Sequence, residues 1–150
     1  MIQARADATV PARPATVFAS VVDLDNADWL PTVRRLRRLG REKELGARYA
    51  VEVGVLGRHL SGVLVCREFD APRRAVYVLE EGIDLSITLD VVALRGGSKL
   101  TIEARYSLGS SLGAGALEMA SAGAARREVA RAVEQLAARF VRSDQAKAGA

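Results

Sequence analysis

The chain has 150 residues, a formal net charge of +4 at pH 7, one cysteine (Cys66) and one histidine (His59). The length fits one domain, and a lone cysteine and a lone histidine exclude an internal disulfide and a zinc site without carboxylates, so no metal or cofactor is expected. Arg5 and Asp7 stand where a secretion signal is apolar, and no segment reaches about 18 apolar residues, which predicts a soluble, cytoplasmic protein without a membrane span.

The amino-terminal part of the chain predicts one strand and two short helices. Apolar and polar residues alternate over residues 2–10, as in a strand with one buried face. Pro14 suits the first turn of a helix, and apolar residues recur at a spacing of four after it. Asp and Asn residues typical of turns follow, and we expect a second short helical turn there, carrying Trp29.

Patterns typical of strands then return and predict six consecutive strands. They cover residues 32–39, 47–56, 58–69, 75–82, 83–91 and 99–108. The sequence "RGGS" between the last two is a strong hairpin signal. Because each strand follows the preceding one after a short turn, the pattern favours an antiparallel sheet.

The last element is a long helix from about Leu112 to Val141. Its second half has an apolar stripe at the spacing of a buried helix face, formed by Val129, Val133, Leu136 and Phe140. Its first half consists almost entirely of Gly, Ala and Ser. The sequence therefore predicts one domain over residues 1–142 and a disordered tail over residues 143–150.

Two segments resemble a known family. They are "VPARPATVFASVVDLDNADWLPTV" at the first helix and "CREFDAPRRAVYVLEEG", a strand, a turn and a strand. Over about residues 2–141 the chain is similar to the SRPBCC superfamily, which includes START lipid-transfer domains, plant pathogenesis-related allergens and polyketide cyclase/dehydrase-like proteins. The resemblance implies an α+β helix-grip fold, in which a curved seven-stranded antiparallel sheet wraps around the long carboxy-terminal helix.

The same resemblance implies an elongated apolar cavity between the sheet and that helix. The small side chains of the helix's first half agree with it, because they leave volume unfilled opposite a concave sheet. Alternatively, they let the helix pack closely against the sheet and give a dry core. The residues expected to line the cavity are Trp29, Val51, Val53, Leu64, Cys66, Glu68, Tyr77, Leu85, Ile87, Ile102, Tyr106, Leu112, Ala116, Met119 and Gly123.

Few polar residues are available for chemistry in such a cavity. Family members that cyclise polyketides use polar residues of the fourth strand, and this chain departs from that pattern there. Glu68 is the candidate for an acid, a base or a contact with a ligand's polar head; otherwise it pairs with an arginine at the strand end. Cys66 is a pocket thiol or a small buried hydrophobe. No other catalytic residue is predicted.

Three more side chains have two interpretations each. Tyr77 and Tyr106 either orient a ligand or form hydrogen bonds within the protein. Trp29 either gates the cavity or wedges its helix against the sheet. His59 alternates with the core-facing residues of its strand and is expected at the surface.

The strand over residues 32–39 is rich in arginine. Arg34, Arg35, Arg37 and Arg38 could contact phosphates, but no aromatic residues interleave with them to stack bases, and charged side chains suit an edge strand. Nucleic acid is therefore not expected as a partner. Val63 and Val65 are apolar on the outer face of the sheet, which points to a covered surface, as in a homodimer.

The leading hypothesis from the sequence is a carrier or sensor that encloses an apolar small molecule of lipid, quinone or polyketide type. An enzyme of the cyclase or dehydrase type, with Glu68 or a tyrosine as acid or base, is the second hypothesis. An interaction module that uses the arginine-rich strand is the third.

Overall fold

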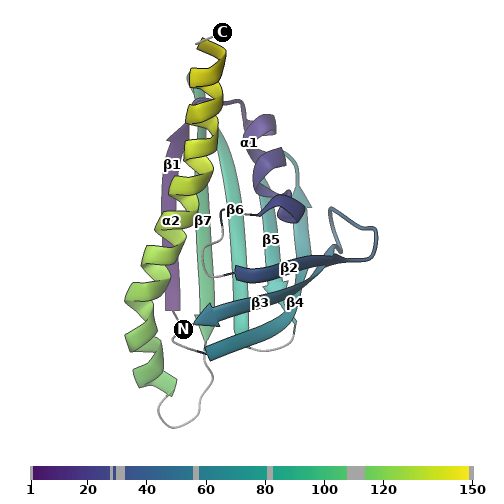
Figure 1. Ribbon diagram of the computed structural model, residues 1–150, viewed down its shortest axis with the longest axis vertical. Coiled ribbons are helices and arrows are strands. Elements are labelled where there is room, and N and C mark those ends of the chain that lie inside the picture. The colour runs from purple at the N-terminus through teal and green to yellow at the C-terminus, as the bar shows by residue number, and fades with distance from the viewer. Residues whose placement is uncertain are drawn as a thin grey trace.

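The computed structural model describes residues 2–27, 29, 33–55, 58–80, 83–107 and 114–148. It contains a curved sheet, a long helix and two short helices (Figure 1). The elements are β1 (Ile2–Val10), α1 (Pro14–Val21), the 3-10 helix η1 (Leu24–Asn26), β2 (Val33–Leu39), β3 (Arg48–Val55), β4 (Arg58–Asp70), β5 (Arg74–Leu79), β6 (Asp84–Leu94), β7 (Gly97–Ser107) and α2 (Ala114–Ala148).

All neighbouring strands are antiparallel, in the order β1-β7-β6-β5-β4-β3-β2. The predicted fold class, a seven-stranded antiparallel sheet with a long carboxy-terminal helix, is confirmed. The hairpin expected at "RGGS" joins β6 to β7, where Leu94 pairs with Gly97 across a tight turn. Gly96 in this turn has a φ of 83°, which glycine adopts without steric cost.

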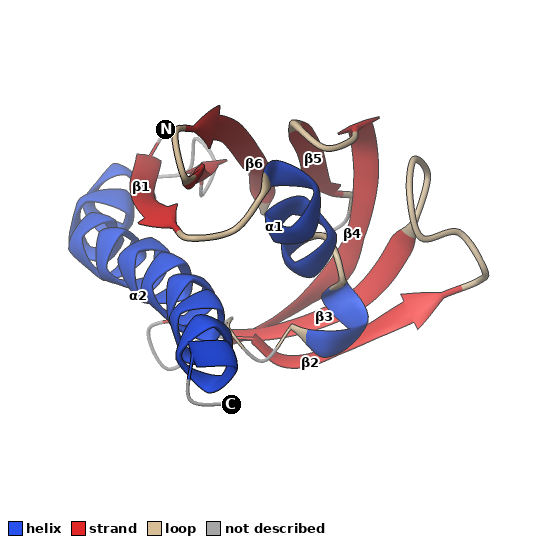
Figure 2. Cartoon of the chain, turned by 90° about the horizontal axis from the view of Figure 1, so that it is seen from above, coloured by secondary structure: helices blue, strands red, loops and turns tan. Residues whose placement is uncertain are grey.

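The sheet bends so far that β2 and β3 cross in front of the other strands in the view of Figure 1. Seen from above, it curves around α1, and α2 lies at its β1 end (Figure 2). We call the face of the sheet toward α1 and α2 the concave face. The alternate apolar residues of every strand lie on this face, because side chains along a strand point to opposite sides.

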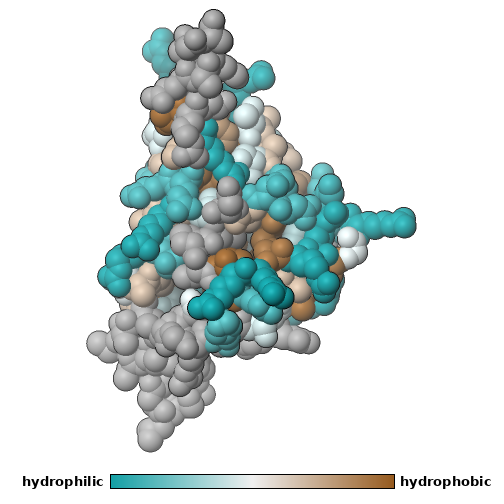
Figure 3. Space-filling view, in the orientation of Figure 1, coloured by the Kyte–Doolittle hydropathy of each residue, from teal (hydrophilic) through white to brown (hydrophobic). Residues whose placement is uncertain are grey.

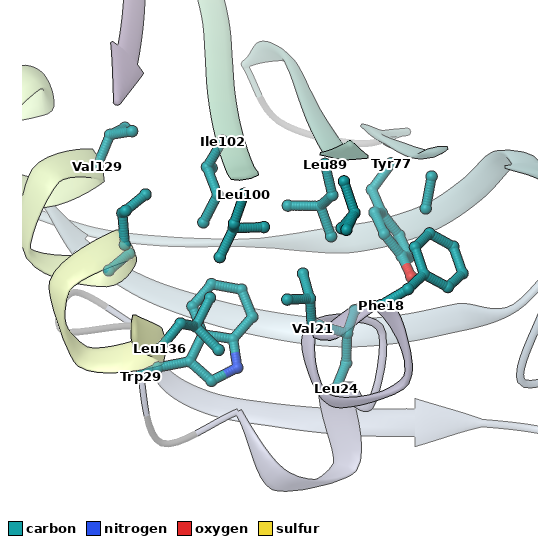
Figure 4. Packing of buried hydrophobic residues seen from close by; sticks show 14 of the residues in the cluster. Phe18, Val21, Leu24, Trp29, Tyr77, Leu89, Leu100, Ile102, Val129 and Leu136 are labelled. Atoms are coloured by element: carbon teal, nitrogen blue, oxygen red, sulfur yellow. The ribbon is translucent and has the colours of Figure 1, made fainter. Parts of the chain in front are cut away.

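The predicted apolar stripe docks α2 against β1 and β7. Val129, Val133 and Leu136 are buried, and Phe140 packs partly buried against the same core. Leu136 has no exposed surface and lies beside Trp29 (Figure 4). Burial of this stripe holds the second half of the helix in place, since each fully buried leucine or valine contributes about 1.5–3 kcal/mol.

Two boundaries differ from the sequence prediction. The helical turn after α1 is η1, which ends at Asn26, so Trp29 lies in a separate turn instead of on the helix. The long helix runs to Ala148, and the backbone of residues 143–148 is helical where a disordered tail was expected. Good helix formers, including Gln145, Ala146 and Lys147, continue the helix although the apolar stripe has ended.

The outer face of the sheet carries an ion-pair network. The Glu80 carboxylate lies 2.9 Å from Arg48 and 2.8 Å from Arg67. Arg48 is the direct cross-strand neighbour of Val65, and Arg67 lies two residues further along the same strand and face. Val65 is buried although it lies outside the main core. This burial is present within a single chain, so Val65 does not require a second subunit to cover it.

Arginine-rich β2 is the edge strand of the sheet, as predicted. Arg34, Arg35 and Arg37 are exposed, whereas Arg38 is partly buried and its Nε lies 3.5 Å from an Asp25 carboxylate oxygen.

Candidate functional site

The concave face carries a patch of apolar side chains that the helices do not fully cover. The strand register places Leu85 beside Tyr106, Ile87 beside Ala104 and Leu79 beside Leu64 on this face. We call the partly buried members the concave patch. They are Val53, Leu79, Leu85, Ile87 and Ala104.

Fully buried residues surround the concave patch. Six of the fifteen cavity residues predicted from the sequence are among them, because the alternation of each strand fixes which face they occupy. They are Val51, Leu64, Cys66, Tyr77, Ile102 and Tyr106. Tyr106 also has an interaction partner within the protein.

Glu68 does not lie on the concave face. A β-bulge between Cys66 and Glu68 adds one residue to β4, so that Cys66 pairs with Tyr77 but Glu68 pairs with Val76. The Glu68 side chain is 53% exposed, and its carboxylate lies 3.5 Å from the guanidinium Nε of Arg74. The predicted inward position of this carboxylate is therefore wrong, and Phe69 packs toward the core instead.

Cys66 and Tyr77 place two polar groups within the apolar core. The Cys66 thiol donates a hydrogen bond to the backbone carbonyl of Glu68 at 3.3 Å, and burial raises the pKa of this thiol. The Tyr77 hydroxyl is buried and the Cys66 thiol influences its pKa, but no described residue forms a well-aligned hydrogen bond with it. Burial also raises the pKa of Tyr77, so that its hydroxyl keeps its proton and can donate a hydrogen bond. It points toward Phe18 of α1 (Figure 4).

Trp29 lies in the interior beside Leu136 of α2. Its indole Nε1 is buried and, like the Tyr77 hydroxyl, has no hydrogen-bond partner in the described part of the chain. The indole ring is 3% exposed and belongs to the buried core beside Leu136, which supports the interpretation of Trp29 as a wedge.

The first half of α2 contributes little to a description of the site. Ala116 and Met119 are helical, but their side chains lie outside the described residues, as does Leu112 entirely. Gly123 is partly buried, and a Cβ atom added there would lie 3.5 Å from Nη1 of Arg127. Of these four predicted cavity residues, the structure describes the surroundings of Gly123 alone. His59 is exposed, as predicted.

Two open pockets lie outside the concave patch, and none of the predicted cavity residues lines either of them. One, of about 580 Å³, lies between η1 and β2 and has Leu24, Val33 and Leu36 beside Arg34, Arg35 and Arg139. Figure 3 shows exposed hydrophobic atoms (brown) among hydrophilic ones (teal) between α1 and β2. The other, of about 640 Å³, lies beside α1 and includes Phe18, Tyr49 and Phe69.

Sequence reasoning missed Phe18, Tyr49 and Phe69 as site residues. All three were visible as apolar positions of a helix or strand, but periodicity does not report which of them meet in space. The pocket unites residues separated by up to 57 positions, from Ala15 to Pro72.

Within the described part of the chain, no group of three or more His, Cys, Asp or Glu residues could hold a metal ion. Among the described helices, none is long and apolar enough to cross a membrane.

Comparison with known proteins identifies the family. A family model described as "Polyketide cyclase / dehydrase and lipid transport" matches residues 1–141. No curated protein sequence matches the chain significantly.

Several solved structures share the fold. The protein TTHA0849 from Thermus thermophilus is 20% identical with a TM-score of 0.81, over 94% of this chain and 98% of that one. A START superfamily protein from Mycobacterium smegmatis is 14% identical with a TM-score of 0.71, over 91% and 97% of the two chains. BexL, a di-domain ARO/CYC from the BE-7585A biosynthetic pathway, is 20% identical with a TM-score of 0.63, over 90% of this chain and 46% of that one.

At these identities the similar structures establish the fold and leave the ligand open. The family model covers nearly the whole chain, and the sheet order, the long helix and the two short helices agree with it. The chain therefore belongs to the polyketide cyclase/dehydrase and lipid transport family of the SRPBCC superfamily.

Proposed function

We propose that this protein binds an apolar small molecule of lipid, quinone or polyketide type against the concave face of its sheet. The observation that carries the proposal is the concave patch, whose aliphatic side chains face the helices and yet remain partly exposed. Apolar side chains gathered on one inward face are typical of a ligand-binding surface, whereas single exposed ones are ordinary.

Ligand binding would remove the remaining apolar surface of the concave patch from water. Such burial contributes about 25 cal/mol for each Å² of apolar area, which favours binding without any polar contact. A ligand with a carbonyl or hydroxyl group would gain more, because the Tyr77 hydroxyl lacks a partner among the described residues and Tyr77 is the direct cross-strand neighbour of Ile87.

The family description supports this class of ligand, since it names polyketide cyclases and dehydrases together with lipid transport. BexL, a di-domain ARO/CYC from the BE-7585A biosynthetic pathway, shares the fold. These proteins suggest polycyclic or chain-like apolar molecules as the first compounds to test.

Binding can be tested by native mass spectrometry with oleic acid and by displacement of 1-anilinonaphthalene-8-sulfonate. Ile87→Asn places an amide in the middle of the concave patch, and we expect it to weaken binding at least about tenfold. Thr88→Asn, on the opposite face of the same strand, is the matched control and should bind normally. Equal binding by both variants, or no uptake of any apolar probe by the unaltered protein, would overturn the proposal.

A cyclase or dehydrase remains a second candidate, and one observation favours a specific residue for it. The Tyr77 hydroxyl is an enclosed hydrogen-bond donor that could polarise a ligand carbonyl. Glu68 no longer qualifies, because its carboxylate is at the surface. Turnover of a poly-β-ketone substrate that disappears in Tyr77→Phe, with binding retained, would favour the enzyme over the carrier.

A further inference from the structure

A second pocket, separate from the concave patch, lies beside α1. We call it the α1 groove. It has a volume of about 640 Å³ and opens to solvent between α1, η1, the β2–β3 loop and the β4–β5 turn. Figure 2 shows α1 next to β4 and above β3, the arrangement that brings these segments together. None of the concave-patch residues lines it, so its ligand can be tested independently.

The inner wall of the α1 groove is aromatic and apolar. Phe18 of α1 and Phe69 of β4 are in edge-to-face contact, with ring centroids 5.4 Å apart and an interplanar angle of 68°. Phe69 reaches this position because of the β-bulge, which turns it toward the concave face. Leu24 and the aromatic ring of Tyr49 complete the wall. Such a wall suits the flat or aliphatic body of a small molecule.

The rim of the α1 groove is acidic, although the protein as a whole has a formal net charge of +4. Asp23, Asp25 and Glu44 line it together with a single base, Lys43. The Asp23 carboxylate accepts a hydrogen bond from Asn26 Nδ2 at 2.8 Å, and Asp25 lies 3.5 Å from Arg38. Glu44 has no ion-pair partner among the described residues. The rim is therefore lined by three carboxylates and one basic side chain.

Tyr49 links the apolar wall to the acidic rim. The residue is only 2% exposed, and the hydrogen bonds found in the described part of the chain do not include its hydroxyl. Burial raises the pKa of Tyr49 most. The charge of Asp25 raises this pKa further, Arg38 opposes that effect, and Asp23 adds a weaker increase, so the Tyr49 hydroxyl lies within the field of the charges at the rim. A hydroxyl oxygen that lines a pocket and has no partner among the described residues can accept a hydrogen bond from a cationic N–H donor.

We propose that the α1 groove binds an organic cation, a protonated amine with an aromatic or branched aliphatic body. Its body packs on Phe18 and Phe69, and its ammonium group lies toward Asp23, Glu44 and the Tyr49 oxygen. The faces of the aromatic rings and the carboxylates attract the same positive charge, which selects amines over neutral or anionic compounds of equal shape.

Three probes of similar shape and different charge test this selection at pH 7. They are 2-phenylethylammonium, 2-phenylethanol and 3-phenylpropionate. Backbone amide shifts of the 15N-labelled protein report both affinity and location. We expect the ammonium to shift amides of α1 and the β4–β5 turn and to bind about tenfold more tightly than the alcohol, with the carboxylate weakest.

Two pairs of variants locate the site. Ala19→Trp fills the α1 groove from an exposed position on α1 and should abolish binding, whereas Thr16→Trp, exposed on the same helix but outside the lining, should not change it. Asp23→Asn combined with Glu44→Gln should weaken the ammonium about fivefold and leave the alcohol unchanged.

Three results would overturn the proposal. They are equal binding of the ammonium and the carboxylate, unchanged binding in Ala19→Trp, and no shift at α1 with any amine in the folded protein. Because Ile87 does not line the α1 groove, Ile87→Asn should bind the ammonium normally, which separates this test from that of the proposed function.

Discussion

Cys66 and Tyr77 face each other across β4 and β5, and both side chains are almost completely enclosed, with 1% and 2% of their surface exposed. Each side chain acts on the pKa of the other, and burial is the largest effect on both. The protein thus keeps two ionisable groups neutral inside an apolar core. Neutral groups are favoured there, because charging either one without a partner would cost far more than keeping its proton.

The buried thiol should be chemically inert in the folded protein. A raised pKa reduces the thiolate fraction, and the thiolate is the species that reacts with alkylating reagents. We expect iodoacetamide at pH 8 to leave Cys66 unmodified in the native protein and to modify it fully in 6 M guanidinium. The mass increase measured by mass spectrometry distinguishes the two states, and rapid modification of the native protein would contradict the enclosed position.

Tyr77 should make the protein lose stability in alkaline solution. Its folded-state pKa lies above the usual value of about 10, so above that pH the unfolded chain releases the proton first and unfolding is favoured. The stabilising contribution is complete below pH 10 and is lost as the pH rises further. Tyr77→Phe should reduce this loss, as measured by urea unfolding at pH 7 and pH 11.

At pH 7 the Tyr77→Phe variant should be at least as stable as the original protein. A buried hydroxyl without a partner costs about 1–3 kcal/mol, and the substitution removes it while keeping the ring. A large decrease in the free energy of unfolding would mean that the hydroxyl has a partner after all.

Glu68 should be dispensable for both stability and ligand binding. Its carboxylate is exposed and 3.5 Å from Arg74, and such surface pairs are worth about 0–1 kcal/mol. We expect Glu68→Gln to retain oleic acid binding and to shift the urea midpoint only slightly. Loss of binding in this variant would show that the Glu68 carboxylate belongs to the binding site. That position would require β4 to have a different register.

Two glycines should respond to alanine in opposite directions. A Cβ at Gly123, within α2, meets only ordinary contact with Arg127, so Gly123→Ala should stabilise the helix by about 0.5–1 kcal/mol. A Cβ at Gly97 would collide with the backbone carbonyl oxygen of Val10, so Gly97→Ala should destabilise the protein. Thermal unfolding of the two variants measures both effects, and equal midpoints would contradict the packing around Gly97.

The register of the strands explains why most concave-face residues could be predicted. In β7, and in β6 as far as Val91, apolar and polar residues alternate, and residues such as Ile87 and Ile102 lie on the predicted face. The same local pattern identified the docking stripe of α2, for example Val133 and Leu136. These features depend on neighbours in sequence, so the sequence alone is sufficient for them.

The position of Glu68 could not be predicted in this way. A β-bulge adds one residue and exchanges the two faces of the strand beyond it, and no residue of "CREF" signals where that occurs. Pairing with β5 decides it, because the bulge lets Phe69 enter the core while the charged Glu68 stays in water.

The amino-acid sequence by itself thus determined the order of strands and helices, the buried face of the strands that lack a bulge and the edge position of the arginine-rich strand, since all of these follow from local periodicity and charge. Only the tertiary structure decided which side chains meet. The α1 groove joins Phe18, Tyr49 and Phe69 from three elements, and the Glu80 carboxylate bridges two arginines over Val65. Such contacts between residues distant in sequence depend on the curvature of the sheet and on strand register, which are properties of the packed chain as a whole.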